Sequence, residues 1–304
     1  MKRLFGTLLG MIVLWLSAGI ITSQELKPNL GLIREQWGRS PHAMSMDSEE
    51  ERKTMNTAAC AHCHTAQGFW EVILDGKESS APYENPAGLT CITCHFPKKI
   101  AAGDGTLRTQ KPESACTGCH DILVQNDSQG FSSCLQGSML SGIGGAHFSN
   151  EDYPTGAHTS IPGGCVGCHM AATPDGQYMY MIGGHSFRAI SKGKGGRHLN
   201  PSGCLSCHEA ITLADVEKSQ LSVRKQMAIL EKLLPKFKEG STGKEVPRFP
   251  KDPGLTETQE KASYNYYYIL KDGTWGIHNP VYIQRLLADS IQALEEEKTD
   301  RIGY

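Results

Sequence analysis

Five copies of one short pattern, Cys-x-x-Cys-His, constrain this chain of 304 residues more than any other feature. The pattern uses ten of the eleven cysteines and five of the twelve histidines, so one chemistry explains almost all of the cysteine content. It is typical of covalent haem attachment, in which two thiols bond to the haem and the adjacent histidine becomes the proximal ligand of the iron. We therefore expect five covalently attached haem c groups. The predicted attachment cysteines are Cys60, Cys63, Cys91, Cys94, Cys116, Cys119, Cys165, Cys168, Cys204 and Cys207, and the predicted proximal ligands are His64, His95, His120, His169 and His208.

Other uses of paired cysteines fit the pattern less well. A zinc ribbon combines its CxxC pairs into four-ligand sites and does not need a histidine after each second cysteine. A thioredoxin-like dithiol occurs once, and an iron–sulfur protein has tighter cysteine spacing without a fixed histidine. A framework of disulfide bonds is the remaining structural alternative.

The composition predicts that haem supplies much of the core. Only 39% of the residues are hydrophobic and 33 are glycine, so a core made of polypeptide alone would be small. We expect a mainly α multihaem cytochrome c fold, in which loops and short helices wrap around a packed haem array, with long C-terminal helices and little β structure. The formal net charge of −2 gives no electrostatic sign of nucleic-acid binding.

The N-terminal segment predicts export to the periplasm or another extracytoplasmic compartment. Lys2 and Arg3 precede an uncharged, mostly apolar run over residues 4–21, as in a secretory signal. The run also approaches the length of a membrane span, so a retained inner-membrane anchor is the alternative. The expected organisation is a leader or anchor at residues 1–23, a pentahaem-binding domain at 24–208 and a helical part at 209–304.

Beyond residue 208 the sequence predicts three amphipathic helices. Apolar residues recur at three- and four-residue steps from Leu213 to Leu234, and a second run of residues 257–272 is closed by Gly273. The third helix begins at Asn279, a helix-capping residue followed by proline at the first helical position. We expect these helices to pack against the haem-binding part and each other; self-association through them is a hypothesis.

Seven histidines outside the fifth place of the motifs are candidates for the second axial position of each iron. Flanking glycine, a preceding proline or a following helix start favours four of them as distal ligands: His42, His158, His185 and His278. For the fifth position, His147 and His198 compete, and we assign His147 to the first haem. His62 lies between the first two attachment cysteines and cannot easily turn toward another iron.

The order of these parts resembles the pentahaem cytochrome c nitrite reductases and their octahaem hydroxylamine-oxidising relatives. The likeness covers most of residues 35–295: a W-x-x-S-x-H-A step before the first motif, a Gly-x-His run before a motif that ends in CHM, a Gly-His segment between the last two motifs, and a late WGIHNP. It implies that the four favoured histidines are distal ligands. It also implies a mostly α-helical fold with closely packed haems, and a homodimer contact through the C-terminal helices.

The chain departs from that family in its catalytic residues. The nitrite reductases carry lysine in place of the motif histidine at the active-site haem, whereas this chain has His64 there. The family's catalytic tyrosine after the third motif has no counterpart, and its catalytic arginine has no clear match. His147 falls near the position of the family's active-site histidine.

Two functions follow from these residues. Irons with histidine on both sides would carry electrons in anaerobic or extracytoplasmic respiration, with a quinol-oxidising membrane protein or other cytochromes as redox partners. The alternative is a reductase of a small nitrogen or sulfur oxyanion, of the nitrite or hydroxylamine type. It would act at one open iron, most readily the first, with His147 as proton donor. An extracellular haem wire is a third class that nothing in the sequence specifies.

Two further features stand outside the motifs. Cys134 is the one cysteine without a haem, and we interpret it as a small packed residue. Lys192, Lys194 and Arg197 form a cationic loop, which is either solvated or a docking surface for an acidic redox partner or for haem propionates.

Overall fold

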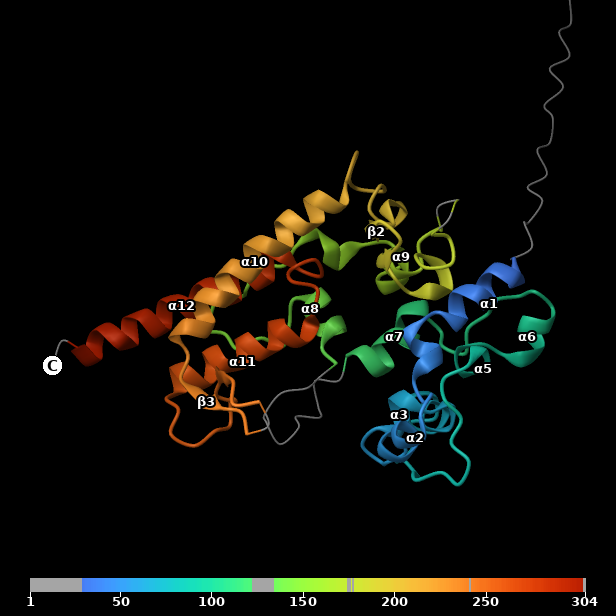
Figure 1. The fold of residues 1–304 in the computed structure, drawn as a ribbon, viewed down its shortest axis with the longest axis horizontal. Coiled ribbons are helices and arrows are strands. Elements are labelled where there is room, and N and C mark those ends of the chain that lie inside the picture. The colour runs from blue at the N-terminus through green and yellow to red at the C-terminus, as the bar shows by residue number, and fades with distance from the viewer. Residues whose placement is uncertain (1–28, 122–133, 174–175, 177, 241, 303–304) are drawn as a thin grey trace, which may run out of the picture.

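The computed structural model describes residues 29–121, 134–173, 176, 178–240 and 242–302 (Figure 1). Within these residues helices dominate, and strands occur only as two antiparallel pairs, so the expected mainly α fold is confirmed. The leader predicted at residues 1–23 lies outside the described residues. In the part of the chain that is described, no helix is both long and apolar enough to cross a membrane.

Short helices and turns form the motif-bearing part of the chain, which lies opposite the long helices in Figure 1. They are short because the sequence is broken by glycine and proline and because several of them contain only one attachment motif. The elements before the long helices are α1 (Leu30–Gly38), η1 (Pro41–Met44), α2 (Glu49–Met55), α3 (Ala61–His64), α4 (Ala66–Gly68), the π-helix η2 (Phe69–Leu74), α5 (Cys91–Cys94), α6 (Pro97–Ala101), α7 (Pro112–His120), α8 (Gln136–Ser141), η3 (Ala157–Ser160), α9 (Cys165–His169), η4 (Gly184–Ser186) and η5 (Pro201–Gly203). Of these, α8 carries no motif and lies beside the long helices in Figure 1.

Each attachment motif forms about one helical turn. In the first motif the backbone N–H of His64 donates to the carbonyl of Cys60 at 3.1 Å, and His208 donates to Cys204 in the same way at 2.9 Å. A bond of this kind closes a turn between residues four apart, which places the first cysteine and the histidine on the same side of the backbone. The local fold therefore presents sulfur and imidazole together.

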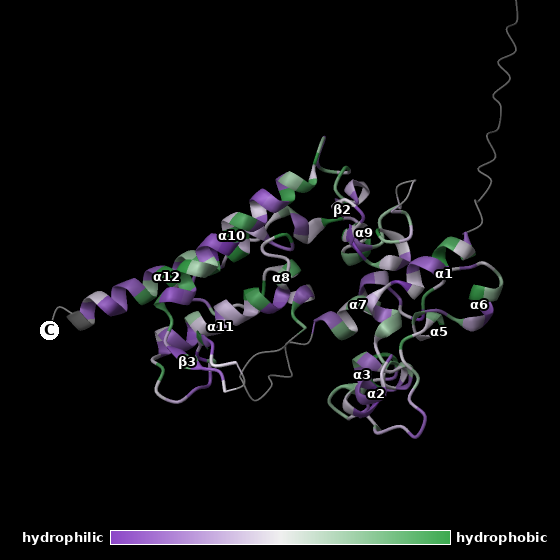
Figure 2. Ribbon diagram, in the orientation of Figure 1, coloured by the Kyte–Doolittle hydropathy of each residue, from purple (hydrophilic) through white to green (hydrophobic). Residues whose placement is uncertain are grey.

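Three long helices form the C-terminal part, as the periodicity predicts. They are α10 (Leu213–Leu233), α11 (Glu257–Asp272) and α12 (Pro280–Ile302), and α12 contacts both of the others. Capping boxes at Thr212 and Thr256 begin the first two helices, and Gly273 ends α11 with a φ of 73°. Figure 2 shows hydrophobic and hydrophilic residues alternating along α10 and α12, which is the pattern of helices with one packed face.

The core of this part includes residues that lie well before the three helices in sequence. Leu135, Met139 and Tyr153 are buried with the apolar faces of α10, α11 and α12. Buried Asn265 of α11 exchanges two hydrogen bonds of 2.8 Å with the backbone of Ala146 and also donates to a serine of α12. The segment around residue 146 is therefore fixed to the long helices.

The two strand pairs are small. Strands β1 (Ile190–Gly193) and β2 (Gly196–Leu199) form one hairpin, and β3 (Lys236–Lys238) pairs with β4 (Glu245–Pro247) in the loop that joins α10 to α11. The first hairpin carries the predicted cationic loop. Arg197 in this hairpin forms an ion pair of 2.9 Å with Glu217 of α10, so one of its three cations is already paired within the chain.

Candidate haem-binding sites

Four pairs of histidine rings lie opposite each other, tilted or edge-on, across gaps of nearly equal width. Each pair joins one motif histidine to one histidine from outside the motifs, and the ring centres are 6.0 to 6.4 Å apart. The pairs are His120 with His42, His95 with His185, His208 with His158, and His169 with His278.

The width of these gaps fits one metal atom bound between two imidazoles. Bonds of about 2 Å from metal to nitrogen, extended by about 1 Å from each nitrogen to its ring centre, separate the two centres by roughly 6 Å. A direct hydrogen bond between the two rings would bring their centres closer. The same spacing recurs at four places that are distant in sequence, so it arises from the tertiary fold rather than from one local turn.

Three of the paired histidines have a lowered pKa, which favours the neutral state that metal binding requires. Burial, together with smaller effects of the neighbouring His120 and His169, lowers the pKa of His42 to about 4. Burial likewise lowers the pKa of His169 and His185 below the usual value. A neutral imidazole offers a free lone pair to a metal, whereas a protonated ring does not.

The attachment cysteines meet the complementary requirement for sulfur. None of the ten motif cysteines forms a disulfide bond in the described chain. Burial raises the pKa of the Cys94, Cys168 and Cys204 thiols, which means that their surroundings favour uncharged sulfur. A thioether bond to haem also leaves the sulfur uncharged, so the surroundings fit the attached group. The residues present therefore fit covalent haem c at these places.

Two of the outer histidines are positioned by buried polar residues of α1 and of the turn that follows it. His42 lies in η1 directly after Pro41, and Ser40 caps this turn by accepting from the Ala43 N–H. Gln36 is 2% exposed, and its side-chain oxygen accepts from the His185 backbone N–H at 3.0 Å. Gln36 was not predicted as a site residue from the sequence. The only sign of its role in the sequence is that a polar residue occupies the inner side of a short helix.

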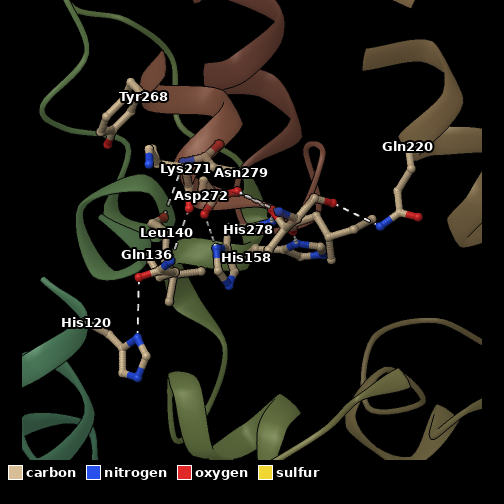
Figure 3. Close-up of polar contacts among 12 residues, drawn as sticks. His120, Gln136, Leu140, His158, Gln220, Tyr268, Lys271, Asp272, His278 and Asn279 are labelled. Carbon is tan, nitrogen blue, oxygen red and sulfur yellow. Dashed lines mark hydrogen bonds and ion pairs between the residues drawn. The ribbon is translucent and has the colours of Figure 1, made fainter. Parts of the chain in front are cut away.

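The other two outer histidines are fixed where α11 turns into α12 (Figure 3). The Nδ1 atom of His158 lies 2.6 Å from the carbonyl oxygen of Ile277, and Nδ1 of His278 lies 2.5 Å from a carboxylate oxygen of Asp272. Buried Asn279 caps α12 and also accepts from the Gly156 N–H at 2.9 Å. One turn between two helices thus orients a ligand candidate from each of two different pairs.

The motif helices form a connected row. Helix α3 contacts α7, α7 contacts α9, and α9 contacts η5, which directly precedes the fifth motif. Sulfur atoms meet along this row, because the pKa of the Cys63 thiol is raised chiefly by its contact with Cys119, and that of Cys116 chiefly by Cys165. The first, third, fourth and fifth motifs therefore follow one another in space.

Phe187 lies where the second, third and fourth motifs converge. Its ring centre is 4.7 Å from that of His42 and 5.9 Å from that of His185. Its carbonyl oxygen accepts from Nδ1 of His169 at 3.0 Å. Its φ of 55° is unusual for a bulky residue, and such strain is tolerated only where the surroundings require it.

The first motif has no histidine partner. All twelve histidines lie within the described residues, and no ring contact joins His64 to another of them. The His64 ring is partly buried, which lowers its pKa, while its hydrogen bond to the Ser45 backbone has the opposite effect. An iron on this motif would therefore receive one axial histidine from this chain.

The His147 ring, which was predicted to serve the first haem, contacts tyrosines rather than the first motif histidine. The His147 ring stacks on Tyr153 with centres 3.8 Å apart, and its Nε2 lies 3.2 Å from the hydroxyl of Tyr282. Tyr282 belongs to α12, so His147 is held among the long helices by the same contacts that fix residues 145 and 146. In the described chain no ring contact joins it to His64, so these contacts do not support a role as fifth distal ligand or as proton donor there.

The remaining two histidines also lie outside the ring pairs. His198, the competing candidate, stacks on Tyr178 with ring centres 3.6 Å apart, and its Nε2 lies 3.2 Å from the Lys194 carbonyl oxygen. His62 is 6% exposed inside the first motif, and contact with Cys63 raises its pKa.

Comparison with known proteins identifies the fold. No protein-family model matches the chain, and no curated protein sequence matches it. Two similar solved structures are the outer cell wall cytochrome OcwA, with a TM-score of 0.57 and 21% identity, and an undecahaem cytochrome from the S-layer of Carboxydothermus ferrireducens, with a TM-score of 0.52 and 19% identity. The alignments cover 85% and 86% of this chain but only 49% and 40% of those proteins, so this chain spans less than half of either. The chain thus has the fold of a part of two cytochromes.

Proposed function

We propose that the chain is a multihaem c-type cytochrome that carries electrons through haems attached to its five motifs. The observation that carries this proposal is the set of four histidine pairs whose ring centres are 6.0 to 6.4 Å apart. Haem supplies one-electron chemistry when bound, and a histidine on each side of the iron leaves no position for a substrate there. The chain's own contribution is to hold, orient and enclose these groups.

The row of motif contacts favours electron transfer through the whole array. Because α3, α7, α9 and η5 are in successive contact, groups held by their cysteines would lie close together. The second motif joins the array at Phe187, which touches ligand candidates of the second and third motifs. Electrons could then enter from a redox partner at one motif and leave at another.

We also propose that the chain acts outside the cytoplasm. Covalent haem attachment of this kind accompanies export, and residues 1–23 have the pattern of a secretory leader. The names of the two similar structures place them in an outer cell wall and an S-layer, which supports a comparable location for this chain.

Mass spectrometry of the exported protein tests the proposal. The mature chain should carry five haem additions, and replacing Cys204 and Cys207 by serine should remove one. In the oxidised protein four haems should be low-spin, because four motif histidines face a second histidine. Fewer than five additions in the wild type would refute the motif count, and five high-spin haems would refute the histidine pairs.

A second candidate function is binding and reduction of a small ligand at the first motif. The specific observation is that His64 faces no other histidine, so an iron there could accept an exogenous molecule. With reduced dye as electron donor, turnover of nitrite or hydroxylamine would support this function. Absence of turnover together with exogenous-ligand binding at the first motif would leave electron transfer as the function.

A further inference from the structure

A buried carboxylate contacts one of the proposed iron ligands. Asp272 is the last residue of α11, its side chain is 0% exposed, and its Oδ1 lies 2.5 Å from Nδ1 of His278. Its other carboxylate oxygen accepts a hydrogen bond of 3.2 Å from the Thr274 backbone N–H and a second bond from the Thr274 hydroxyl. Figure 3 shows Asp272 and His278 side by side at the turn between α11 and α12.

The position is an unfavourable one for an acidic residue. The C-terminal end of a helix carries partial negative charge, so a carboxylate there is repelled, and burial of a charge adds a desolvation cost. The bonds from His278 and Thr274 offset this cost by charge-assisted hydrogen bonding. An apolar residue could close α11 without any of these contacts, so packing alone does not explain Asp272.

No other paired histidine has an acidic partner among the described residues. The Nδ1 atoms of three other paired histidines lie within hydrogen-bonding distance of neutral oxygens. These are the carbonyl oxygens of Ile277 beside His158 and of Phe187 beside His169, and the side-chain oxygen of Gln136 beside His120. The buried Nδ1 atoms of His42 and His95 have no hydrogen-bond partner in the described chain. One ligand candidate is thus placed in a different electrostatic environment from the rest.

We propose that Asp272 is a positioning residue that lowers the reduction potential of the iron held between His169 and His278. This inference rests on the proposed function, since it needs an iron between that pair. A histidine that donates its outer N–H to a carboxylate becomes a more basic ligand, and a more basic ligand favours ferric over ferrous iron. One-electron reduction by an external one-electron donor adds one negative charge to the site without forming or breaking a bond, and the fixed charge of Asp272 opposes that addition.

The test compares Asp272→Asn with the wild type by spectroelectrochemical titration of the haem-loaded protein. Asparagine keeps the size and the hydrogen-bonding geometry but removes the charge. One of the one-electron transitions should shift to higher potential by at least a tenfold change in its equilibrium constant, about 59 mV. The matched control is Asp289→Asn, because Asp289 lies in α12 and bonds to Arg285 and Tyr153 rather than to a proposed ligand.

The possible outcomes separate the two proposals. A wild type without attached haem would refute the proposed function. Unchanged potentials in an Asp272→Asn protein with its full haem content would refute only this inference. An equal shift in the Asp289→Asn protein would also refute it, since the effect would then be one of net charge.

Thr274→Val supplies the test if Asp272→Asn loses a haem. This variant removes the hydroxyl that donates to the Asp272 carboxylate. The carboxylate charge is then less neutralised and acts more strongly on His278. The same transition should then move to lower potential, in the opposite direction to Asp272→Asn, and no movement would overturn the proposal.

Discussion

The number of carbon monoxide molecules that the reduced protein binds is the most direct measure of how many irons are open. Carbon monoxide binds ferrous haem only where an axial position is free or easily vacated. Four motif histidines face a second histidine, and His64 does not. We therefore expect the wild type to bind one carbon monoxide per chain.

Variants of single histidines turn this count into a test of each assignment. Removing the ring of His185 leaves His95 as the only axial histidine of its iron, so His185→Ala should bind two molecules per chain. His147→Ala and His198→Ala should still bind one, because both rings stack on tyrosines away from the motif histidines. The assay is anaerobic titration of the dithionite-reduced protein, followed by the Soret band and normalised to the haem content measured by mass spectrometry.

Three results would contradict this reasoning. A wild type that binds no carbon monoxide would mean that a side chain other than histidine occupies the position opposite His64. A count of two in the His147→Ala protein would restore His147 as a ligand. A count of one in the His185→Ala protein would show that the pair of His185 with His95 does not enclose an iron.

The remaining predictions concern packing and the contacts between motifs. Leu286→Ala, at a position 0% exposed in the helical core, should lower the free energy of unfolding by about 2–5 kcal/mol in chemical denaturation, whereas Leu221→Ala, at a position 51% exposed, should change it little. Gly203→Ala would place a Cβ 2.9 Å from the Cys168 Cα, so it should lower the free energy of unfolding by about 1–3 kcal/mol. Gly105→Ala enters open space and should be near neutral, and equal effects of the two substitutions would refute the close approach of the last two motifs. Phe187→Gly keeps the carbonyl that accepts from a motif histidine and relieves a φ of 55°, so haem content should be retained while the potentials of two irons change, and unchanged potentials would refute the role of the ring.

Local sequence predicted the elements of this fold but not their long-range partners. The repeated motif, the helical periodicity after residue 208 and the cap at Asn279 are local signals, and the corresponding helices form where they are expected. Which histidine faces which motif is not a local property. His42 precedes the first motif in sequence yet faces His120 of the third, because α7 lies between the first and fourth motifs in space.

The contacts of His147 were not predictable from the sequence for the same physical reason. Its neighbourhood in sequence, between the third and fourth motifs, gives no sign that Asn265 and Tyr282 will bind the adjacent backbone. Those contacts join residues more than a hundred positions apart. A local signal did exist for Asp272, since an acidic residue directly before a helix-ending glycine is electrostatically unfavourable and calls for an explanation.

The two proposals together define an uneven path for electrons. The fourth motif lies inside the row of contacts, between the third and the fifth, whereas the first motif lies at one end. If Asp272 lowers the potential at the fourth motif, an electron must pass a less favourable site to cross the row, and reducing equivalents accumulate on either side of it. The first motif, whose histidine has no histidine partner, would then lie on the same side of the fourth motif as the third and would exchange electrons through the third. Removing the charge of Asp272 should therefore raise the potential at the fourth motif and speed transfer across the row, while the number of open irons stays at one. Stopped-flow reduction of the wild type and of the Asp272→Asn protein measures the rate of transfer, and equal rates together with equal potentials would show that the carboxylate has no part in the path.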